Sequence, residues 1–285
     1  MKIAAISGRA VLVAGESVLD VALASDGRFG PDPMDVFEQW PEFVQWAQGA
    51  PAAGEPLDAA RLGCPVPRPR QVFAIGLNYR SHAEESGMPI PSVPATFTKF
   101  PACLSGPYDE IELSGPGVDG TSVDWPSVDW EVELVVVIGR HADRVSESDA
   151  WDYVAGLTVG QDISDRTLQF AAGMQFSLGK SRRGFGPMGP WVVTPDEFAD
   201  RDSLQLGCSV DGEVVQNGNT SDLVFSVAQL IAELSAVLSL YPGDVIFTGT
   251  PAGVGMARQP PRALAPGQVL ETWVEGIGRL RNVCR

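Results

Sequence analysis

The distribution of apolar residues is most informative between residues 128 and 139. Residues 134–138 are apolar and rich in β-branched side chains, which predicts a strand that is covered on both faces. The first half of the same stretch carries Glu131 and Glu133. Because alternate residues of a strand point to the same side, we expect both carboxylates to project together from one end of a buried strand.

Two carboxylates about 6–7 Å apart at the edge of a core repel each other unless a positive charge lies between them. One explanation of Glu131 and Glu133 is a strand end that reaches solvent, where both side chains are hydrated. The apolar run follows them without a break, however. We therefore favour a divalent cation held by oxygen ligands.

Other apolar patterns predict further elements. Residues 1–20 alternate as in a β-hairpin, and residues 33–49 have helical spacing that Pro41 interrupts. Ser226 with Gln229 forms a capping box before a helix that extends to Leu238. Short strands are expected at residues 72–76, 191–193, 206–209, 214–215, 245–247, 269–273 and 278–282.

The stretch from residue 50 to residue 70 is rich in alanine, proline and glycine, which is typical of a linker or domain boundary. We place a small α+β domain at residues 1–66 and a second domain at residues 67–285. Many short strands and few helices predict that this second domain is mainly β with some α.

The composition of the chain argues against some classes of protein and some kinds of partner. The chain has 285 residues, 44% of them hydrophobic, and contains no apolar run long enough for a transmembrane helix. Its formal charge of −16 argues against nucleic acid or an anionic membrane surface as a partner. An acidic substrate would therefore have to meet a local positive site.

Cysteines and histidines limit the chemistry. The four cysteines are far apart and show no C-x-x-C spacing, so we expect free thiols in a reducing cytoplasm and no zinc site. Only two histidines, His82 and His141, are present, which rules out a histidine-rich metal site and leaves few choices of imidazole base. His82 and Glu85 are three residues apart and would face each other on a helix, although a solvated surface pair has the same spacing.

Several common sites are absent from the sequence. Residues 179–187 form a basic, glycine-bounded loop without the spacing of a phosphate-binding loop, and residues 249–255 lack the dinucleotide-binding pattern. The nucleophile elbow of α/β-hydrolases is also missing. Asp162 stands where a strand is expected to end, and the simplest role for it is the N-cap of the following helix.

Taken together, these residues resemble the fumarylacetoacetate hydrolase family over residues 70–285. The resemblance lies in short motifs that occur in the family's order: Asn78-Tyr79-Arg80 with His82 and Glu85, Asp129-Trp130-Glu131-Val132-Glu133-Leu134, Asp162-Ile163-Ser164, Lys180-Ser181 with Gly186-Pro187-Met188-Gly189-Pro190-Trp191, and Gly243-Asp244 with Gly249-Thr250-Pro251. The first 66 residues resemble the small N-terminal domain of bacterial members with acylpyruvate hydrolase, hydroxyhepta-diene-dioate isomerase or decarboxylase activity.

The resemblance implies a mixed β-sandwich roll, a homodimer, and a divalent ion that is Mg²⁺ or else Mn²⁺ or Ca²⁺. It implies that Glu131, Glu133 and Asp162 are the metal ligands. Three hard carboxylate ligands leave about three octahedral positions for water and a bidentate 2-oxo acid.

The resemblance also assigns roles around the metal. Lys180 corresponds to the active-site lysine, Gln169 and Thr250 to positions that contact substrate, and His82 with Glu85 to a catalytic dyad on a segment that covers bound substrate. Arg80, Arg182 and Arg183 are candidates to bind a distal carboxylate, with a solvent-facing arginine as the alternative for each. Arg183 departs from the family, because many members have an acidic residue at this position.

The implied reaction is metal-dependent hydrolysis of the carbon–carbon bond of a 2,4-dioxo acid, of the acylpyruvate or fumarylpyruvate type, through a metal-bound enolate. The alternatives are an isomerase or decarboxylase acting on an oxo or hydroxy-dienoate dioic acid, and a catalytically silent member that binds an oxo acid.

Overall fold

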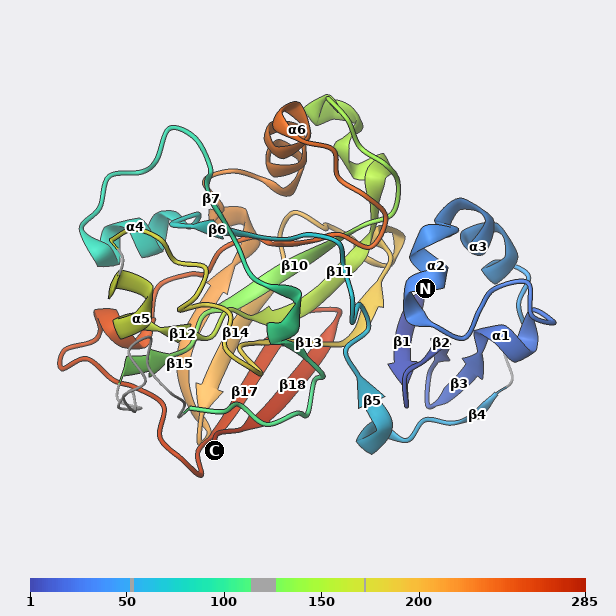
Figure 1. Cartoon of the computed structure of the whole chain (residues 1–285), viewed down its shortest axis with the longest axis horizontal. Coiled ribbons are helices and arrows are strands. Elements are labelled where there is room, and N and C mark those ends of the chain that lie inside the picture. The colour runs from blue at the N-terminus through green and yellow to red at the C-terminus, as the bar shows by residue number, and fades with distance from the viewer. Residues whose placement is uncertain (52–53, 114–126, 172) are drawn as a thin grey trace.

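The computed structural model describes residues 1–51, 54–113, 127–171 and 173–285. Strands predominate over helices, and they form one large mixed sheet and a smaller four-stranded sheet (Figure 1). The predicted class, mainly β with some α, is confirmed. None of the described helices is long and apolar enough to span a membrane.

The N-terminal part forms one end of the molecule, at the right of Figure 1. Its elements are β1 (Lys2–Ile6), β2 (Arg9–Ala14), β3 (Ser17–Asp20), α1 (Val21–Ala24), α2 (Pro33–Glu38), α3 (Trp40–Ala47), β4 (Glu55–Pro56) and β5 (Leu62–Gly63). The predicted hairpin is present as β1 and β2, and β3 extends it. The predicted helical segment is divided at Gln39, and Pro41 lies in the first turn of α3, where a missing N–H is tolerated.

This N-terminal part shares a sheet and a core with the rest of the chain. Strand β1 pairs with β13 (Gly186–Val193), placing Lys2 opposite Val193. Phe37 and Phe43 belong to the same apolar cluster as Val135 and Val137. The division between residues 66 and 67 stays a prediction, and in the structure the two parts pack against each other through apolar side chains.

The large sheet runs in the order β4-β3-β2-β1-β13-β11-β10-β16-β6-β7. Its strands beyond the N-terminal part are β6 (Val72–Gly76), β7 (Ala95–Thr98), β8 (Leu104–Ser105), β10 (Val132–Ile138), β11 (Val154–Gln161), β13 and β16 (Val245–Phe247). All neighbours in that order are antiparallel except β16 and β6, which are parallel.

Strand β10 is buried along its whole length, as its sequence predicts. Val135 and Val137 point into the core that faces α2 and α3, whereas Leu134, Val136 and Ile138 point into the larger core on the opposite face. One expectation is wrong in part: Glu131 does not lie in the same strand as Glu133, because β10 begins only at Val132. Trp130 and Glu131 separate β10 from the two-residue strand β9 (Val128–Asp129), which pairs with β12 (Ser164–Asp165) instead.

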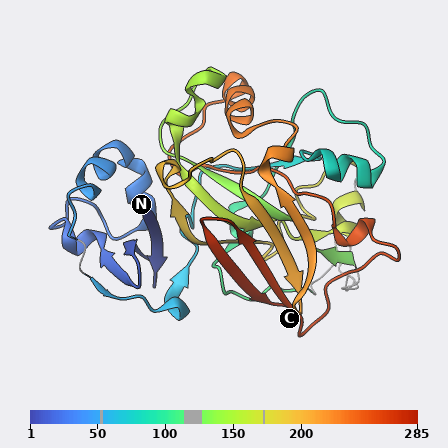
Figure 2. The same cartoon turned by 180° about the vertical axis from the view of Figure 1, so that it is seen from behind.

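The smaller sheet covers the face of the large sheet that lies opposite α2 and α3, as Figure 2 shows from behind. Its order is β15-β14-β17-β18, with β14 (Gln205–Val210), β15 (Glu213–Asn219), β17 (Val269–Val274) and β18 (Gly278–Val283). The remaining α-helices of the described residues are α4 (Arg80–Ser86), α5 (Arg166–Ala171) and α6 (Val227–Val237), and short 3-10 helices connect other elements. Helix α6 begins with the predicted capping box of Ser226 and Gln229. All four cysteines are free.

Candidate metal centre

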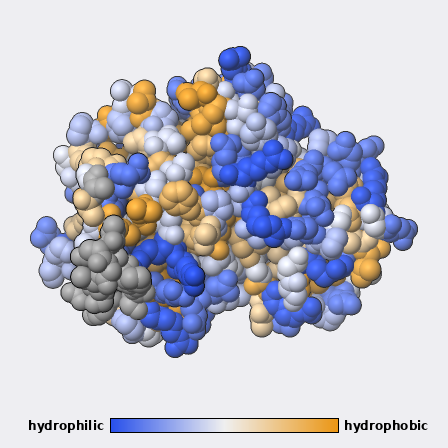
Figure 3. Space-filling model, viewed as in Figure 1, coloured by the Kyte–Doolittle hydropathy of each residue, from blue (hydrophilic) through white to orange (hydrophobic). Residues whose placement is uncertain are grey.

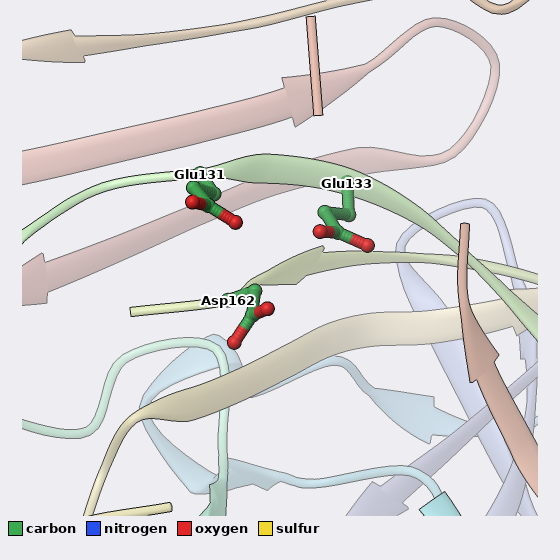
Figure 4. A group of neighbouring side chains, drawn as sticks. All are labelled: Glu131, Glu133 and Asp162. Carbon is green, nitrogen blue, oxygen red and sulfur yellow. The ribbon is translucent and has the colours of Figure 1, made fainter. Parts of the chain in front are cut away.

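Three carboxylates meet where β10 begins and β11 ends. Ligand oxygens of Glu131, Glu133 and Asp162 all lie within 4.8 Å of one another, and Figure 4 shows the three side chains facing a common space. The strand register explains this, because Val132 pairs with Gln161 and so places Asp162 beside Glu131. A hydrogen bond from the Asp162 amide to the Glu131 carbonyl (2.9 Å) continues the pairing.

The interruption of the strand at Trp130 and Glu131 is held by side-chain amides. The Glu131 N–H donates to Gln161 Oε1 and the Val132 N–H donates to Gln216 Oε1, each at 2.9 Å. These bonds replace the ladder bonds that an unbroken strand would make. They fix the backbone that carries Glu131 although the strand stops there.

Glu131 is held by two cations. Lys180 Nζ lies 2.6 Å from its Oε2, and Arg166 lies 2.7 Å from its Oε1. Burial alone would raise the pKa of Glu131, but Lys180 and Arg166 outweigh burial and lower the pKa to about 2. Arg166 also contacts Asp129 at 2.6 Å. Burial raises the pKa of Asp129 to about 6 despite that contact.

Asp162 is held by two lysines. Lys180 Nζ donates to its Oδ2 at 2.9 Å, and Lys99 Nζ donates to its Oδ1 at 2.6 Å. Lys99 is 1% exposed and also donates to the carbonyls of Lys180 and Phe185. Its three donors are thus shared among the Asp162 carboxylate and two backbone carbonyls, those of Lys180 and Phe185. Burial opposes the charge of Lys99, yet Asp162 keeps its pKa raised.

Sequence reasoning missed Lys99, Arg166 and Asp129 as parts of this site. The available signal for Lys99 is a single charge at the end of a strand pattern, Ala95-Thr96-Phe97-Thr98-Lys99. Such a charge is more common at a solvated strand end, and only the fold brings it to Asp162. The same holds for Arg166, which looks like an ordinary residue in the first turn of a helix.

Glu133 differs from the other two carboxylates. It is 1% exposed, and among the described residues only the N–H of Gly249 donates to it, at 2.7 Å. Gly249 has a φ of 104°, and a Cβ there would lie 2.7 Å from Asn78, so only glycine can present its N–H in this way. Burial, followed by the charges of Asp162 and Glu131, raises the pKa of Glu133 well above its ordinary value.

The donor set fits a hard divalent cation. Oxygens within 4.8 Å of one another can share an ion at the usual distances of about 2.0–2.6 Å. Glu133 gives a further reason, because no lysine or arginine nitrogen in the described part of the chain forms an ion pair with this buried carboxylate. A bound cation would supply the missing positive charge.

The predicted pair of His82 and Glu85 is formed within α4. His82 Nδ1 lies 3.2 Å from Glu85 Oε2, and the N–H of Gly253 donates to Glu85 Oε1 at 2.8 Å. His82 is buried (9% exposed), whereas Glu85 is exposed, so only the histidine of this pair is shielded from solvent. The segment that binds Glu85 also contacts the carboxylate cluster, because the N–H of Gly249 donates to Glu133 and the N–H of Gly253 donates to Glu85.

Asp162 is not a helix cap. The N–H of Leu168 donates to Asp165 Oδ1 at 3.1 Å, so Asp165 binds the N-terminus of α5 and leaves Asp162 to the carboxylate cluster. Asp165 Oδ2 accepts a hydrogen bond from Arg182 at 2.9 Å. The alternative of a solvent-facing Arg182 is therefore wrong, whereas Arg183 is exposed.

The predicted substrate-binding residues have different surroundings. Gln169 is buried and accepts a hydrogen bond from Arg166 at 2.9 Å. Thr250, next to Gly249, is buried and accepts from Gln216 at 2.8 Å. Arg80 is exposed at the surface and donates to the carbonyls of Asp222 and Leu223. Among the described residues, no hydrogen bond joins Arg80 or Thr250 to the three carboxylates, and their roles stay predictions.

Comparison with known proteins agrees with this geometry. Residues 71–285 match the model of the fumarylacetoacetate (FAA) hydrolase C-terminal family. The chain belongs to the fumarylacetoacetate hydrolase family. The family that the sequence motifs resemble, and the fold that this resemblance implies, are thus confirmed.

Solved structures of the family cover the whole chain. The putative HpcE protein from Mycobacterium smegmatis is 49% identical, with a TM-score of 0.92 and coverage of 100% of this chain and 99% of that one. A probable 2-hydroxyhepta-2,4-diene-1,7-dioate isomerase from Mycobacterium abscessus is 29% identical (TM-score 0.83, coverage 100% and 97%). Maleylpyruvate hydrolase from Sphingobium sp. SYK-6, in complex with manganese(II) and pyruvate, is 28% identical (TM-score 0.79, coverage 100% and 98%). The family includes both hydrolases and isomerases.

Proposed function

We propose that this chain is a divalent-metal-dependent hydrolase that cleaves a carbon–carbon bond of a 2,4-dioxo acid. The observation that carries the proposal is the convergence of three buried carboxylates with a lysine, together with a histidine–glutamate pair bound by the same segment, residues 249–253, that contacts Glu133. The similar maleylpyruvate hydrolase, with manganese and pyruvate bound, supports both the metal and the product.

Glu131, Glu133 and Asp162 would hold the ion. When bound, a divalent ion supplies Lewis-acid stabilisation of negative charge on the oxygens of a 2-oxo acid. Lys180 adds a positive charge at the same place, because its ammonium contacts both Glu131 and Asp162. An acid substrate would thus meet a local positive site in a chain whose net charge is −16.

His82 is the proposed general base. The Glu85 carboxylate, fixed by the N–H of Gly253, accepts a hydrogen bond from Nδ1 of His82 and leaves Nε2 free to take a proton. Nε2 would remove a proton from a water molecule that attacks the C4 carbonyl. The bond between C3 and C4 then breaks, and the proton is delivered to C3. One dioxo acid and one water give pyruvate and a carboxylic acid.

The histidine–glutamate pair favours hydrolysis over isomerisation or decarboxylation, because hydrolysis requires an activated water. Acetylpyruvate, oxaloacetate and a hydroxyhepta-diene-dioate test this choice when each is incubated with and without EDTA. We expect equimolar pyruvate and acetate from acetylpyruvate, loss of the reaction with EDTA, and recovery with Mg²⁺ or Mn²⁺. Turnover of only the dienoate or oxaloacetate would contradict the proposal.

Three related expectations stay predictions. We expect Mg²⁺ as the physiological ion, a homodimer, and a cytoplasmic protein. Mass measurement by light scattering after gel filtration would decide the oligomeric state, and metal analysis of the purified protein would identify the ion.

A further inference from the structure

The structure also bears on the acyl group of the substrate. If the proposed function holds, the 2-oxo acid end of the substrate lies at the three carboxylates and Lys180. The far end then depends on what surrounds Lys180. A second carboxylate there would need a cation with free donors, whereas an apolar group would need an apolar wall.

The arginines and lysines near the site are already engaged. Arg166 binds Asp129, Glu131 and Gln169. All three donors of Lys99 have protein acceptors. Arg166 Nε is buried without a hydrogen-bond partner among the described residues, but the charge of Arg166 is already shared by two carboxylates. A buried cation that is paired in this way can bind a further anion only by weakening an existing pair.

The outer cations are engaged too. Arg182 binds Asp165, and Arg80 binds two backbone carbonyls. Arg258 donates to the carbonyl of Val215 and lies over the ring of Trp130. Arg183 is exposed, and an exposed charge is screened by solvent and ions.

Two further parts of the chain contain no basic residue that could bind a second carboxylate. Between α4 and Lys99, residues 87–98 contain no lysine, arginine or histidine. The residues outside the described part, 52–53, 114–126 and 172, contain none either. Every lysine and arginine of the chain is therefore among the described residues.

An apolar wall begins at Lys180. Lys180 Nζ lies 5.5 Å from the ring centre of Phe97. The Phe97 ring packs edge-on against Phe176 at 5.6 Å, and Phe176 packs edge-on against Phe170 at 5.8 Å. A hydrogen bond between the hydroxyls of Thr98 and Ser177 (3.3 Å) holds the two segments together.

The aromatic row leads from the buried lysine to the surface. Phe170 is 41% exposed, and exposed apolar side chains also occur in the segments that follow α4 and α5: Met88, Ile90, Met174 and Leu178. Tan and orange surface lies on this side of the molecule in Figure 3, around α4 and α5 as labelled in Figure 1. Apolar side chains exposed beside a polar site are typical of a ligand-binding surface.

We infer that the substrate is a monocarboxylic 2,4-dioxo acid whose acyl group is apolar, an alkyl or aryl chain that lies along Phe97, Phe176 and Phe170. The inference rests on the proposed function for the placement of the oxo-acid end. It specifies the acyl group, which the metal centre alone leaves open.

A matched pair of compounds tests the inference. Benzoylpyruvate and its para-carboxylated analogue differ by one charged group at the far end. With the Mn²⁺-loaded full-length protein, we expect kcat/KM to be about 10–100-fold higher for benzoylpyruvate, because the added carboxylate would lose water without gaining a cation. Equal or better turnover of the carboxylated analogue would overturn the inference.

Binding of the same pair separates this inference from the proposed function. If neither compound is cleaved, the proposed hydrolysis fails, but calorimetric titration of both compounds still gives their relative affinity. Tighter binding of benzoylpyruvate would support the apolar wall, and tighter binding of the carboxylated analogue would refute it.

Three variants test which residues cause the preference for benzoylpyruvate over its carboxylated analogue. Phe170→Arg adds a cation at the end of the row and should reduce the preference for benzoylpyruvate at least about threefold. Leu23→Arg, a matched change of an exposed apolar residue in the N-terminal part, should leave the preference unchanged. Arg183→Met should also leave it unchanged. No effect of Phe170→Arg, or a changed preference in Arg183→Met, would contradict the proposed path of the acyl group.

Discussion

The floor and the roof of the site are built differently. The floor consists of three buried carboxylates, Glu131, Glu133 and Asp162, and lysine or arginine side chains bind the first and the last of them. The roof consists of His82 and Glu85 on the seven-residue helix α4. Among the described residues, Gly253 donates to Glu85, and Arg80 and Ser81 bind the first turn of α4 to Asp222 and Leu223. The floor is thus held by ion pairs in the core, whereas the roof is held by hydrogen bonds of one short helix.

This difference separates two kinds of mutational effect. Changes in the floor should alter metal binding and stability together, because the same carboxylates serve both. Changes in the roof should alter turnover and leave the floor intact.

The roof gives the largest expected effect on turnover. His82→Ala should lower kcat by about 10²–10⁴-fold, because general-base catalysis is lost, and it should leave metal affinity unchanged. Steady-state kinetics and calorimetric titration with Mn²⁺ measure the two quantities. The matched control is His141→Ala, which removes the exposed histidine that packs against Tyr241. Full hydrolysis by His82→Ala would show that the histidine is not the base.

The floor gives the largest expected effect on stability. Lys99→Met should destabilise the metal-free protein by about 3–5 kcal/mol, because Asp162 loses a buried partner. Added Mn²⁺ should recover part of this loss by supplying the missing charge. Urea unfolding with and without Mn²⁺ measures both effects.

The control for Lys99 is Asp244→Asn. Asp244 is buried and accepts hydrogen bonds from Gln71 and Tyr241. The loss should be about 1–3 kcal/mol, and Mn²⁺ should not preferentially recover it. Equal recovery of both variants by Mn²⁺ would show that Lys99 has no special relation to the floor.

Glu133 should give a smaller effect that depends on pH. Because burial raises its pKa, the folded metal-free protein binds this proton more tightly than the unfolded chain. Stability from this group is therefore present below the ordinary glutamate pKa of about 4.3 and falls as the pH rises towards the raised value. Glu133→Gln should remove that fall.

The pH effect has a direct readout in metal binding. A divalent ion should displace the proton from Glu133, so titrations in buffers of different ionisation enthalpy should show proton release in the wild type. The release should be reduced in Glu133→Gln. Identical proton release in the two proteins would place the proton elsewhere.

The sequence correctly predicts the structural features that depend on residues close together in the chain. The capping box at Ser226, the burial of residues 134–138 on both faces and the contact between His82 and Glu85 follow from spacing alone. Each of these features is decided within one turn of helix or one strand, where periodicity carries the information.

Long-range contacts set the limit of the sequence argument. Whether Asp162 or Asp165 caps α5 depends on the register between β10 and β11, and both residues have the chemistry of a cap. Lys99 follows β7, which three strands separate from β11 in the sheet, and it still reaches Asp162, 63 residues away in the chain. The interruption of the strand before β10 depends on amides from Gln161 and Gln216, which no local pattern connects.

The most direct test of the account is a metal titration of the EDTA-treated protein. We expect one Mn²⁺ or Mg²⁺ per chain, and a loss of affinity of at least about 100-fold in Glu131→Gln, Glu133→Gln and Asp162→Asn, with no change in Asp244→Asn. Failure of the wild-type protein to bind either ion at millimolar concentration would contradict the metal centre. A metal affinity in the three carboxylate variants equal to that of the wild type would contradict it too.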